Sequence, residues 1–303
     1  MRLNPFDADN INVGSTGGGF PGGGGGKIGC GTLVIAIIGA VVFGLDPMQT
    51  IGTLGGGGQP AQVEQQAGPQ SVEELCNSNP YALETCNALS SLNQTWEPIF
   101  AEANIPFQAP RLNFASGQFN TACGAASVGM GPFYCPGDQG IYIDTNFYRT
   151  MEEQLGAGGD FARYYVIAHE YGHHIQTITG ISNQIRSAQQ QNPRAANQLQ
   201  VLMELQVDCY AGVWAGRNRN LIEPGDMEEG LRAASAIGDD ALQRNAGQRV
   251  NPPAQNGARR CALGWKPGTT PSATGFSTCA DRDRSPCGAD HAVPFSRKFS
   301  KTA

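Results

Sequence analysis

The stretch that decides the fold is residues 168–175, AHEYGHHI, which contains the pattern H-E-x-x-H. On a helix, His169 and His173 stand four residues apart, so both imidazoles leave one face and can converge on one metal ion. Neutral imidazoles are good zinc ligands, and a catalytic zinc site adds a third protein ligand and an open position for a water whose pKa the metal lowers. Glu170 would accept a proton from that water and pass it to the leaving amine. Ordinary histidines on an amphipathic helix are the weaker interpretation, because the full pattern sits inside a good helix.

The helix that carries this pattern has recognisable ends. Asp160 is the expected N-cap, and apolar residues follow at helical spacing to about Thr179, where Gly180 stops the helix. Gly172 inside the helix costs about 1 kcal/mol relative to alanine, which indicates that another backbone approaches closely there. His174 points about 100° away from its neighbour and is expected to pack or to support the site.

A second helix, predicted over 195–215 after a polar connection at 181–193, supplies the missing ligand. It carries Glu204 and Asp208, which are four residues apart and hence on one face. We expect Glu204 to be the third zinc ligand and Asp208 to accept the free ring N–H of a ligand histidine, which fixes its tautomer. The reverse assignment stays open, because both carboxylates suit zinc. Such a pair is usually solvated, but apolar neighbours indicate a buried helix, in which an unpaired carboxylate is costly. Those neighbours are Val201, Leu202, Leu205, Val207 and Trp214.

The segments that precede this helix pair predict helices followed by a sheet. Ser71 begins a helical region that reaches Phe100, with Glu74 completing a capping box. Alternating apolar residues and turn signals then predict a small antiparallel sheet over 111–114, 131–136 and 141–144. The edge of such a sheet either holds an extended peptide by main-chain hydrogen bonds or merely packs against the metal helix, and both interpretations stay open. The expected fold class is α+β.

Four of the nine cysteines form two closely spaced pairs. Cys76 and Cys86 are ten residues apart, and Cys123 and Cys135 are twelve apart. Neither pair has the C-x-x-C spacing of a zinc knuckle. Local disulfides in an oxidising compartment are favoured over a reduced chain, and unpaired burial of the first pair is the alternative.

The composition excludes one class of partner and indicates an unusual N-terminal region. A net charge of −6 and a pI near 5.2 provide no basic footprint, so no nucleic-acid partner is expected. Many of the 41 glycines crowd into the first 60 positions of the 303-residue chain. Residues 1–27 are therefore predicted to be a flexible Gly-rich tail, and residues 46–70 a linker.

Between the tail and the linker, residues 28–45 form an uncharged apolar run of eighteen residues, long enough to cross most of a bilayer core. A cleaved signal peptide lacks its A-x-A-like site here, a lipoprotein would have its cysteine after the run, and a core helix between glycine tracts has nothing to pack against. We expect a single-pass membrane anchor, with Lys27 on the cytoplasmic side. The catalytic domain would then be extracytoplasmic, and periplasmic in a Gram-negative cell.

Taken together, these motifs resemble one known family. The Gly-rich tail, the apolar segment, GPFYCPGDQGIYID, VIAHEYGHHIQ, ELQVDCYAGVWA and GDDALQ are similar to the bacterial membrane-anchored neutral zinc metallopeptidases, a family within the HExxH zincins. The resemblance covers about residues 1–251. It implies one Zn²⁺ per chain, held by His169, His173 and Glu204, with Glu170 as the catalytic base. Gluzincins also place an aspartate four residues after the ligand glutamate, which matches Asp208.

The end of the chain departs from the family. Members continue after residue 250 with a short His-Gly-Ser-like motif and a helix, whereas residues 252–303 are rich in Pro, Gly, Arg and Cys. We expect a disordered or frameshifted tail, in which Cys261, Cys279, Cys287 and His291 are accidental. The gene sequence would test the frameshift.

These observations predict a membrane-anchored zinc metallopeptidase, with its peptidase domain over 71–251, that hydrolyses protein or peptide substrates. One rival is a catalytically inactive scaffold or binding protein that keeps the zincin fold. Another is an envelope hydrolase that acts on non-protein amide bonds at the same site.

Overall fold

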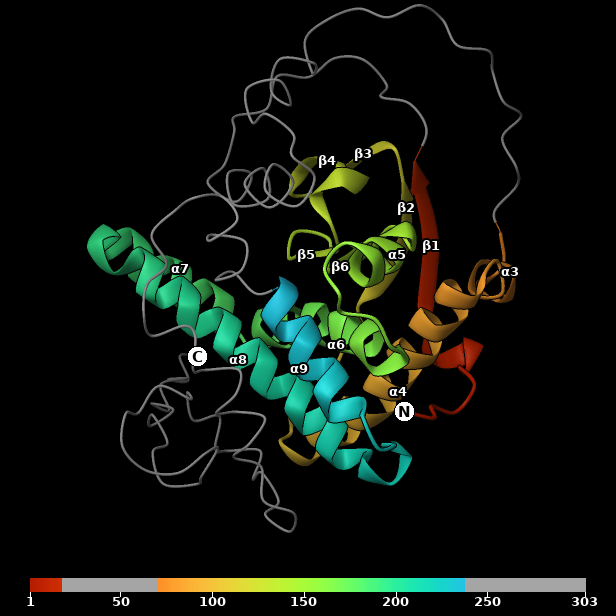
Figure 1. Cartoon of the computed structure of the whole chain (residues 1–303). Helices are drawn as coiled ribbons and strands as arrows, with labels where there is room; N and C mark the ends of the chain where they lie inside the picture. The colour runs from red at the N-terminus through yellow and green to blue at the C-terminus, as the bar shows by residue number, and fades with distance from the viewer. Residues whose placement is uncertain (18–69, 238–303) are drawn as a thin grey trace, which may run out of the picture.

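The computed structural model describes residues 1–17 and 70–237 (Figure 1). Small β-sheets lie beside a group of helices, which is an α+β arrangement. The strands are β1 (Asn12–Gly17), β2 (Arg111–Ser116), β3 (Gln118–Thr121), β4 (Gly124–Ser127), β5 (Phe133–Cys135) and β6 (Gly140–Ile143). The longer helices are α3 (Val72–Cys76), α4 (Pro80–Glu102), α5 (Asn146–Glu153), α6 (Asp160–Ile178), α7 (Ile181–Gln191), α8 (Ala196–Arg217) and α9 (Asp226–Ile237).

The main sheet is mixed, so the prediction of an antiparallel sheet is confirmed for the strands within 131–136 and 141–144 and wrong for the strand at 111–114. Its strand order is β1-β2-β6-β5, in which β1 and β6 run parallel to β2 and only β5 is antiparallel to its neighbour β6. The connection between β2 and β6 contains the hairpin β3–β4 and then β5, so the chain returns beside β2 in the same direction. The result is that β5 forms one edge of the sheet, next to α6.

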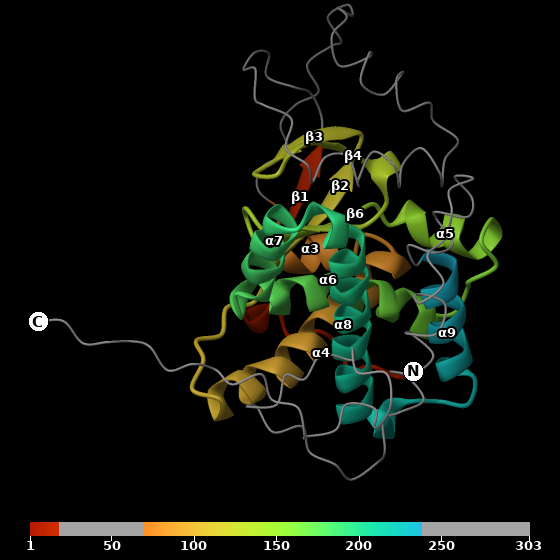
Figure 2. The same ribbon diagram turned by 90° about the vertical axis from the view of Figure 1, so that its left-hand side faces the viewer.

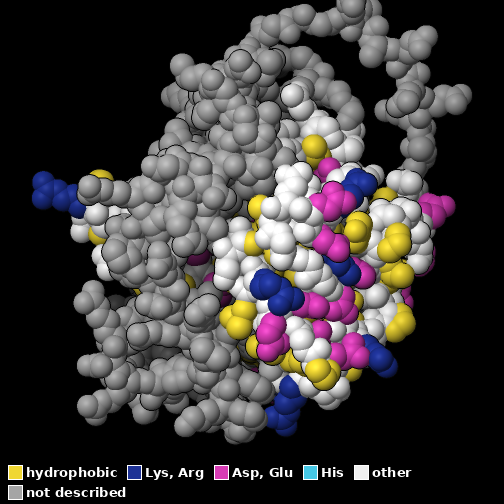
Figure 3. Space-filling model, in the orientation of Figure 1, with side chains coloured by type: hydrophobic (Ala, Val, Ile, Leu, Met, Phe, Trp, Pro, Cys, Tyr) yellow, Lys and Arg dark blue, Asp and Glu magenta, His cyan; other side chains and the backbone are white. Residues whose placement is uncertain are grey.

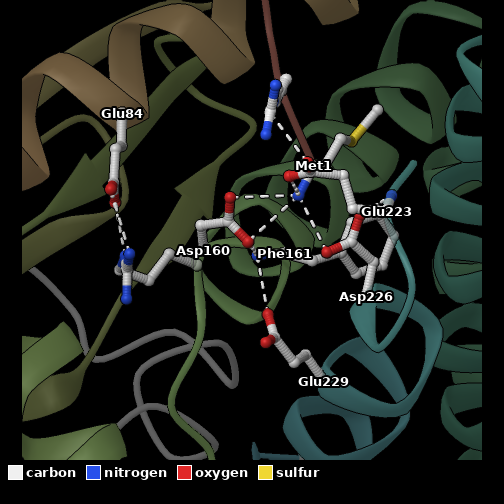
Figure 4. A network of polar contacts seen from close by, with 9 residues as sticks. Met1, Glu84, Asp160, Phe161, Glu223, Asp226 and Glu229 are labelled. Carbon is white, nitrogen blue, oxygen red and sulfur yellow. Dashed lines mark hydrogen bonds and ion pairs between the residues drawn. The ribbon is translucent and has the colours of Figure 1, made fainter. Parts of the chain in front are cut away.

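The first 17 residues belong to the folded domain, so the prediction of a flexible tail is wrong for them. Ile11 and Val13 are buried, and β1 forms a full parallel ladder with β2. The α-ammonium of Met1 is bound by the carboxylates of Asp160 and Asp226 (Figure 4). Composition missed this segment because a short strand needs only a few apolar side chains once a partner strand exists. Residues 18–27 lie outside the described residues.

The predicted membrane anchor at 28–45 and the linker at 46–69 also lie outside the described residues. Among the helices that the structure describes, none has the length and apolar character needed to cross a bilayer. A single crossing at 28–45 would place β1 and β2 on opposite sides of a hydrocarbon core about 30 Å thick, whereas the two strands pair within one sheet. The anchor is therefore not supported, and the extracytoplasmic location stays a prediction.

Helix α6 lies in the middle of the helical layer, with α4, α8 and α9 packed around it (Figures 1 and 2). The expected close approach at Gly172 is present, because a Cβ atom built there would stand 2.7 Å from Cβ of Val207 on α8. A larger residue would push the two helices apart. Bulky buried side chains from the surrounding elements fill the core, including Leu89, Phe100, Ile141, Ile167, Tyr171 and Trp214.

Several local expectations are confirmed and others are shifted. The capping box of Ser71 and Glu74 is present at the start of α3. Gly159, rather than Asp160, is the N-cap of α6. The polar connection predicted over 181–193 is largely the helix α7, because its Gln, Ser and Arg residues are compatible with a helix and its flank packs on α8.

Both predicted disulfides are present in the structure. Cys76–Cys86 joins α3 to α4, and Cys123–Cys135 joins the turn of the β3–β4 hairpin to β5. On the face shown in Figure 3, acidic side chains gather with Lys and Arg side chains scattered among them. The predicted tail at 252–303 lies beyond the described residues.

Candidate metal centre

Three side chains from the neighbouring helices α6 and α8 converge at one point. Nε2 of His169 lies 3.3 Å from Oε2 of Glu204, and Nε2 of His173 lies 3.4 Å from the same oxygen. The three side chains are about one-fifth exposed. The fold thus brings together the three residues that the sequence predicts as zinc ligands, since one nitrogen or oxygen of each lies within 4.8 Å of the others.

The spacing of these atoms fits a tetrahedral zinc ion. Bonds of about 2.0–2.2 Å at tetrahedral angles separate neighbouring ligand atoms by about 3.3–3.6 Å. The two distances from the Glu204 oxygen to the histidine nitrogens, 3.3 and 3.4 Å, fall in that range. Two imidazoles and one carboxylate are also a donor set that catalytic zinc prefers.

Asp208 occupies the orienting position that the sequence predicts. Its Oδ1 lies 3.1 Å from Nδ1 of His169, the ring nitrogen that faces away from Glu204. The hydroxyl of Tyr165 donates a short hydrogen bond to the same carboxylate oxygen. Because Asp208 contacts the outer ring nitrogen, the geometry favours the orienting role over the reverse assignment.

Two further partners of the cluster were missed by sequence reasoning. Oε1 of Gln176 lies 3.1 Å from Nδ1 of His173, and Nε2 of Gln200 donates to Oε1 of Glu204 at 2.6 Å. Their sequence spacing was the available signal, since Gln176 follows His173 by three residues and Gln200 precedes Glu204 by four. Each side chain of the cluster therefore has a partner on an atom that points away from the other two.

The electrostatics of the cluster favour a cation between the three side chains. Burial lowers the pKa of His169, but its hydrogen bonds to Asp208 and Glu204 outweigh burial and hold that pKa well above its ordinary value. The charge of Glu204 likewise raises the pKa of His173 against the effect of burial. Although burial raises the pKa of Glu204, the two imidazoles hold it far below its usual range. A proton or a metal ion would satisfy the same carboxylate.

Glu170 has the properties of a proton-transfer group. Burial raises the pKa of its carboxyl, although the charges of His169 and His173 and the backbone N–H of Tyr134 oppose that rise. A carboxylate with a raised pKa accepts and returns a proton more readily near neutral pH than an ordinary one. Tyr134 belongs to the edge strand β5, so the catalytic candidate and the sheet edge are in contact.

His174 is a buried anchor for that edge strand. With burial lowering the pKa of its imidazole to about 4, the ring is neutral near pH 7. Its Nε2–H donates to the carbonyl of Gln108 at 2.6 Å, and the Tyr134 hydroxyl donates to its Nδ1 at 3.2 Å. The expectation that His174 packs or supports the site therefore has a specific form, which is the attachment of β5 to α6.

An oxyanion at this centre would need a hydroxyl or guanidinium donor, and the sequence near the two motifs offers Tyr171, Arg186, Arg217 and Arg219. The structure removes Tyr171 from that group, because it is fully buried and its hydroxyl donates to Oδ1 of Asn93 at 2.7 Å. Arg217 is the last residue of α8, about 20 Å along the helix axis from Glu204, and Arg219 lies just beyond the end of that helix. Arg186 on α7 stays a candidate, because its charge reaches Tyr134 on β5, where it opposes the burial that raises the pKa of that tyrosine to about 12.

Comparison with known proteins gives matches over most of the chain. A family model described as "Putative neutral zinc metallopeptidase" matches residues 4–265. Uncharacterized protein YpfJ of Escherichia coli strain K12 is 42% identical over 244 residues, which are 80% of this chain and 80% of that protein. Uncharacterized protein Rv2575 of Mycobacterium tuberculosis strain H37Rv is 39% identical over 176 residues, which are 54% of this chain and 57% of that protein. No solved structure matches the chain.

Proposed function

Because the chain belongs to the neutral zinc metallopeptidase family, we propose that it is a zinc-dependent peptidase that cleaves peptide bonds by attack of water. The observation that carries the proposal is the cluster of His169, His173 and Glu204, in which the carboxylate oxygen lies at tetrahedral ligand spacing from both histidine nitrogens. The three side chains would hold one zinc ion through Nε2, Nε2 and Oε2. When bound, zinc supplies Lewis acidity at neutral pH.

Two carboxylates of the chain, Glu170 and Asp208, would have separate roles in the reaction. Glu170 would accept a proton from the attacking water and later deliver it to the amine that leaves. Its raised pKa suits both directions of transfer, because the proton is neither held too weakly nor released too reluctantly. Asp208 would keep His169 in the tautomer that presents Nε2, through the bond of 3.1 Å to Nδ1.

The substrate would lie along β5, the strand of the main sheet that borders the cluster. Among the described residues β5 pairs with β6 alone, so the main-chain groups of its other edge, apart from the Tyr134 N–H that Glu170 accepts, are available for an extended peptide. The contact between the Tyr134 backbone and Glu170 places that edge next to the proton-transfer group. Main-chain recognition would make protein or peptide segments in extended conformation the substrate class.

The experiment that tests this function compares Glu170→Gln with the wild type. We expect one zinc per chain in both proteins by elemental analysis, and cleavage of an unfolded protein substrate that falls about 10²- to 10⁴-fold in the variant. Glu102→Gln, which changes an exposed glutamate of α4, is the matched control and should cleave like the wild type. Equal cleavage by Glu170→Gln, or a folded wild type that binds no zinc, contradicts the proposal. Zinc binding without cleavage would leave the inactive scaffold.

A further inference from the structure

Gln176 is a fully buried amide that joins the two helices of the metal centre. It lies three residues after His173 on α6, and its Oε1 is 3.1 Å from Nδ1 of that histidine. Its Nε2 donates two hydrogen bonds across to α8, to the backbone carbonyl of Met203 and to Oε1 of Gln206, both at 2.9 Å. All three of these contacts are side-chain or backbone groups of the described domain, and Met203 directly precedes Glu204.

The carbonyl of Met203 decides which way the amide of Gln176 faces. A carbonyl oxygen only accepts hydrogen bonds, so the NH₂ end of the amide must face α8 and the oxygen end must face the histidine ring. An amide oxygen also only accepts, so Nδ1 of His173 must carry the proton. The lone pair of that ring then resides on Nε2, the nitrogen 3.4 Å from Glu204.

The two histidines have partners of different charge on the same ring atom. Asp208 is a carboxylate that also receives the hydroxyl of Tyr165, whereas Gln176 is neutral. Three carboxylates, those of Glu170, Glu204 and Asp208, already act on this cluster. A neutral acceptor at Gln176 fixes the second ring without adding another negative charge to the buried cluster. Its bonds to Met203 and Gln206 also tie the ring to the segment of α8 that carries Glu204.

We propose that Gln176 is a positioning residue of this centre, which sets the tautomer of His173 and the register of its ring against Glu204. The proposal rests on the proposed function, because it takes the cluster to be a zinc site. A purely structural role would act on stability alone. A positioning role acts on zinc affinity through the acceptor oxygen, which a conservative variant can restore.

The test uses three variants of the full chain, with zinc affinity measured by competition with a chelator and stability measured by urea unfolding of the zinc-free protein. Gln176→Met keeps the length of the side chain and removes all of its hydrogen bonds. Gln176→Glu keeps an acceptor for His173 but loses the two donors to α8. Asn93→Leu is the matched control, since Asn93 is a buried amide that bonds Asn10 at 2.6 Å and Tyr171 at 2.7 Å without touching the cluster.

We expect Gln176→Met to bind zinc about 10- to 100-fold more weakly than the wild type, the range found for orienting partners of ligand histidines. Gln176→Glu should restore zinc affinity to within about threefold of the wild type while being no more stable than Gln176→Met. Asn93→Leu should lose stability and keep its zinc affinity. Equal zinc affinity in Gln176→Met and the wild type overturns the proposal, and so does an equal loss in Gln176→Met and Gln176→Glu.

A measurement on the wild type keeps the proposal testable where a variant does not fold. In the zinc-loaded protein labelled with ¹⁵N-histidine, Nδ1 of His173 should carry a directly bonded proton that exchanges slowly with water. An Nδ1 without a proton overturns the assignment of Gln176 as its acceptor. A wild-type protein that binds no zinc contradicts the proposed function. Zinc affinity that is unchanged by substitution of Gln176 contradicts this inference alone.

Discussion

The first turn of helix α6 and its middle each gather three side chains that are capable of holding a metal ion, yet the two groups differ in what surrounds those side chains. In the first turn, Asp160 lies with Asp226 and Glu229, and the α-ammonium of Met1 sits among them at 2.8 Å from Asp226 (Figure 4). Later in the helix, His169 and His173 face Glu204. Donor atoms within each group lie within 4.8 Å of one another, so proximity does not distinguish them.

What distinguishes the two groups is the use of their lone pairs. In the first group the carboxylates accept from donors of the chain itself. Both oxygens of Asp160 face the ammonium, while the backbone N–H of Phe161 lies 2.7 Å from Asp160 and 3.2 Å from Glu229. In the second group the partners bind the outer atoms, and the remaining nitrogens and oxygen point at each other. A cluster of carboxylates is therefore a weak sign of a metal site. A stronger sign is a set of ligand side chains whose outer atoms are hydrogen-bonded to other residues, so that the remaining donor atoms face one another.

The largest effect that we expect from the difference between the two groups is on zinc content. Glu204→Ala removes one of three ligands, so the purified full chain should fall from about one zinc per molecule to none by elemental analysis. Asp226→Ala should keep its zinc, because the first group is already satisfied by the ammonium. The reverse pattern, with zinc lost only in Asp226→Ala, would show that the metal binds at the start of the helix.

A smaller effect concerns the stability that the first group provides. Asp226 is buried, so Asp226→Asn should destabilise the fold by about 3 kcal/mol, the cost of breaking a buried pair. Burial alone lowers the pKa of the Met1 ammonium, but Asp226 and Asp160 raise it above its ordinary value. A raised pKa means that this stability is complete below about pH 8 and declines as the pH rises through the folded-state pKa. Urea unfolding from pH 7 to pH 10 measures it, and an equally steep alkaline decline in Asp226→Asn would contradict this assignment.

The smallest effect is steric and acts between the two groups. The added methyl of Gly172→Ala would meet Cβ of Val207 at 2.7 Å, so we expect a loss of about 1–3 kcal/mol in unfolding free energy. Because this contact sets the spacing of α6 and α8, zinc affinity should fall as well. Val207→Gly on its own is the control, because it removes the Cβ atom that makes the 2.7 Å contact, and combined with Gly172→Ala it should recover part of both losses. Additive losses in the double variant would show that the two side chains do not meet.

The parts of the molecule that the sequence revealed depend on spacing within a single helix. His169 and His173 share a face of α6, and Glu204 and Asp208 share a face of α8, so their convergence needed only one contact between the helices. Gly172 inside the helix predicts that contact as well, because it indicates close approach of another backbone. The disulfides were predictable for the same reason, because each closes a short loop.

The parts that the sequence concealed depend on partners distant along the chain. The role of Gln176 requires the carbonyl of Met203 on another helix, which no local pattern encodes. The mixed sheet depends on two parallel pairings between segments distant along the chain, of β1 with β2 and of β2 with β6. The sequence of β1, NVGSTG, has a single large apolar side chain and so gives no alternating strand pattern. Likewise, the polar composition of 181–193 predicts a loop, whereas packing on α8 stabilises most of this segment as the helix α7.

The pairing of β1 with β2 also sets the order in which the molecule can assemble. Gly17 pairs with Ser116, so the strand must wait for 99 more residues before its partner exists. At a synthesis rate of about 5–20 residues per second, the delay is about 5–20 s. Met1 waits longer, because Asp226 comes 225 residues after it. Until β2 is made, the main-chain groups on both sides of residues 12–17 can pair with other chains, so the nascent protein can associate wrongly through its own beginning.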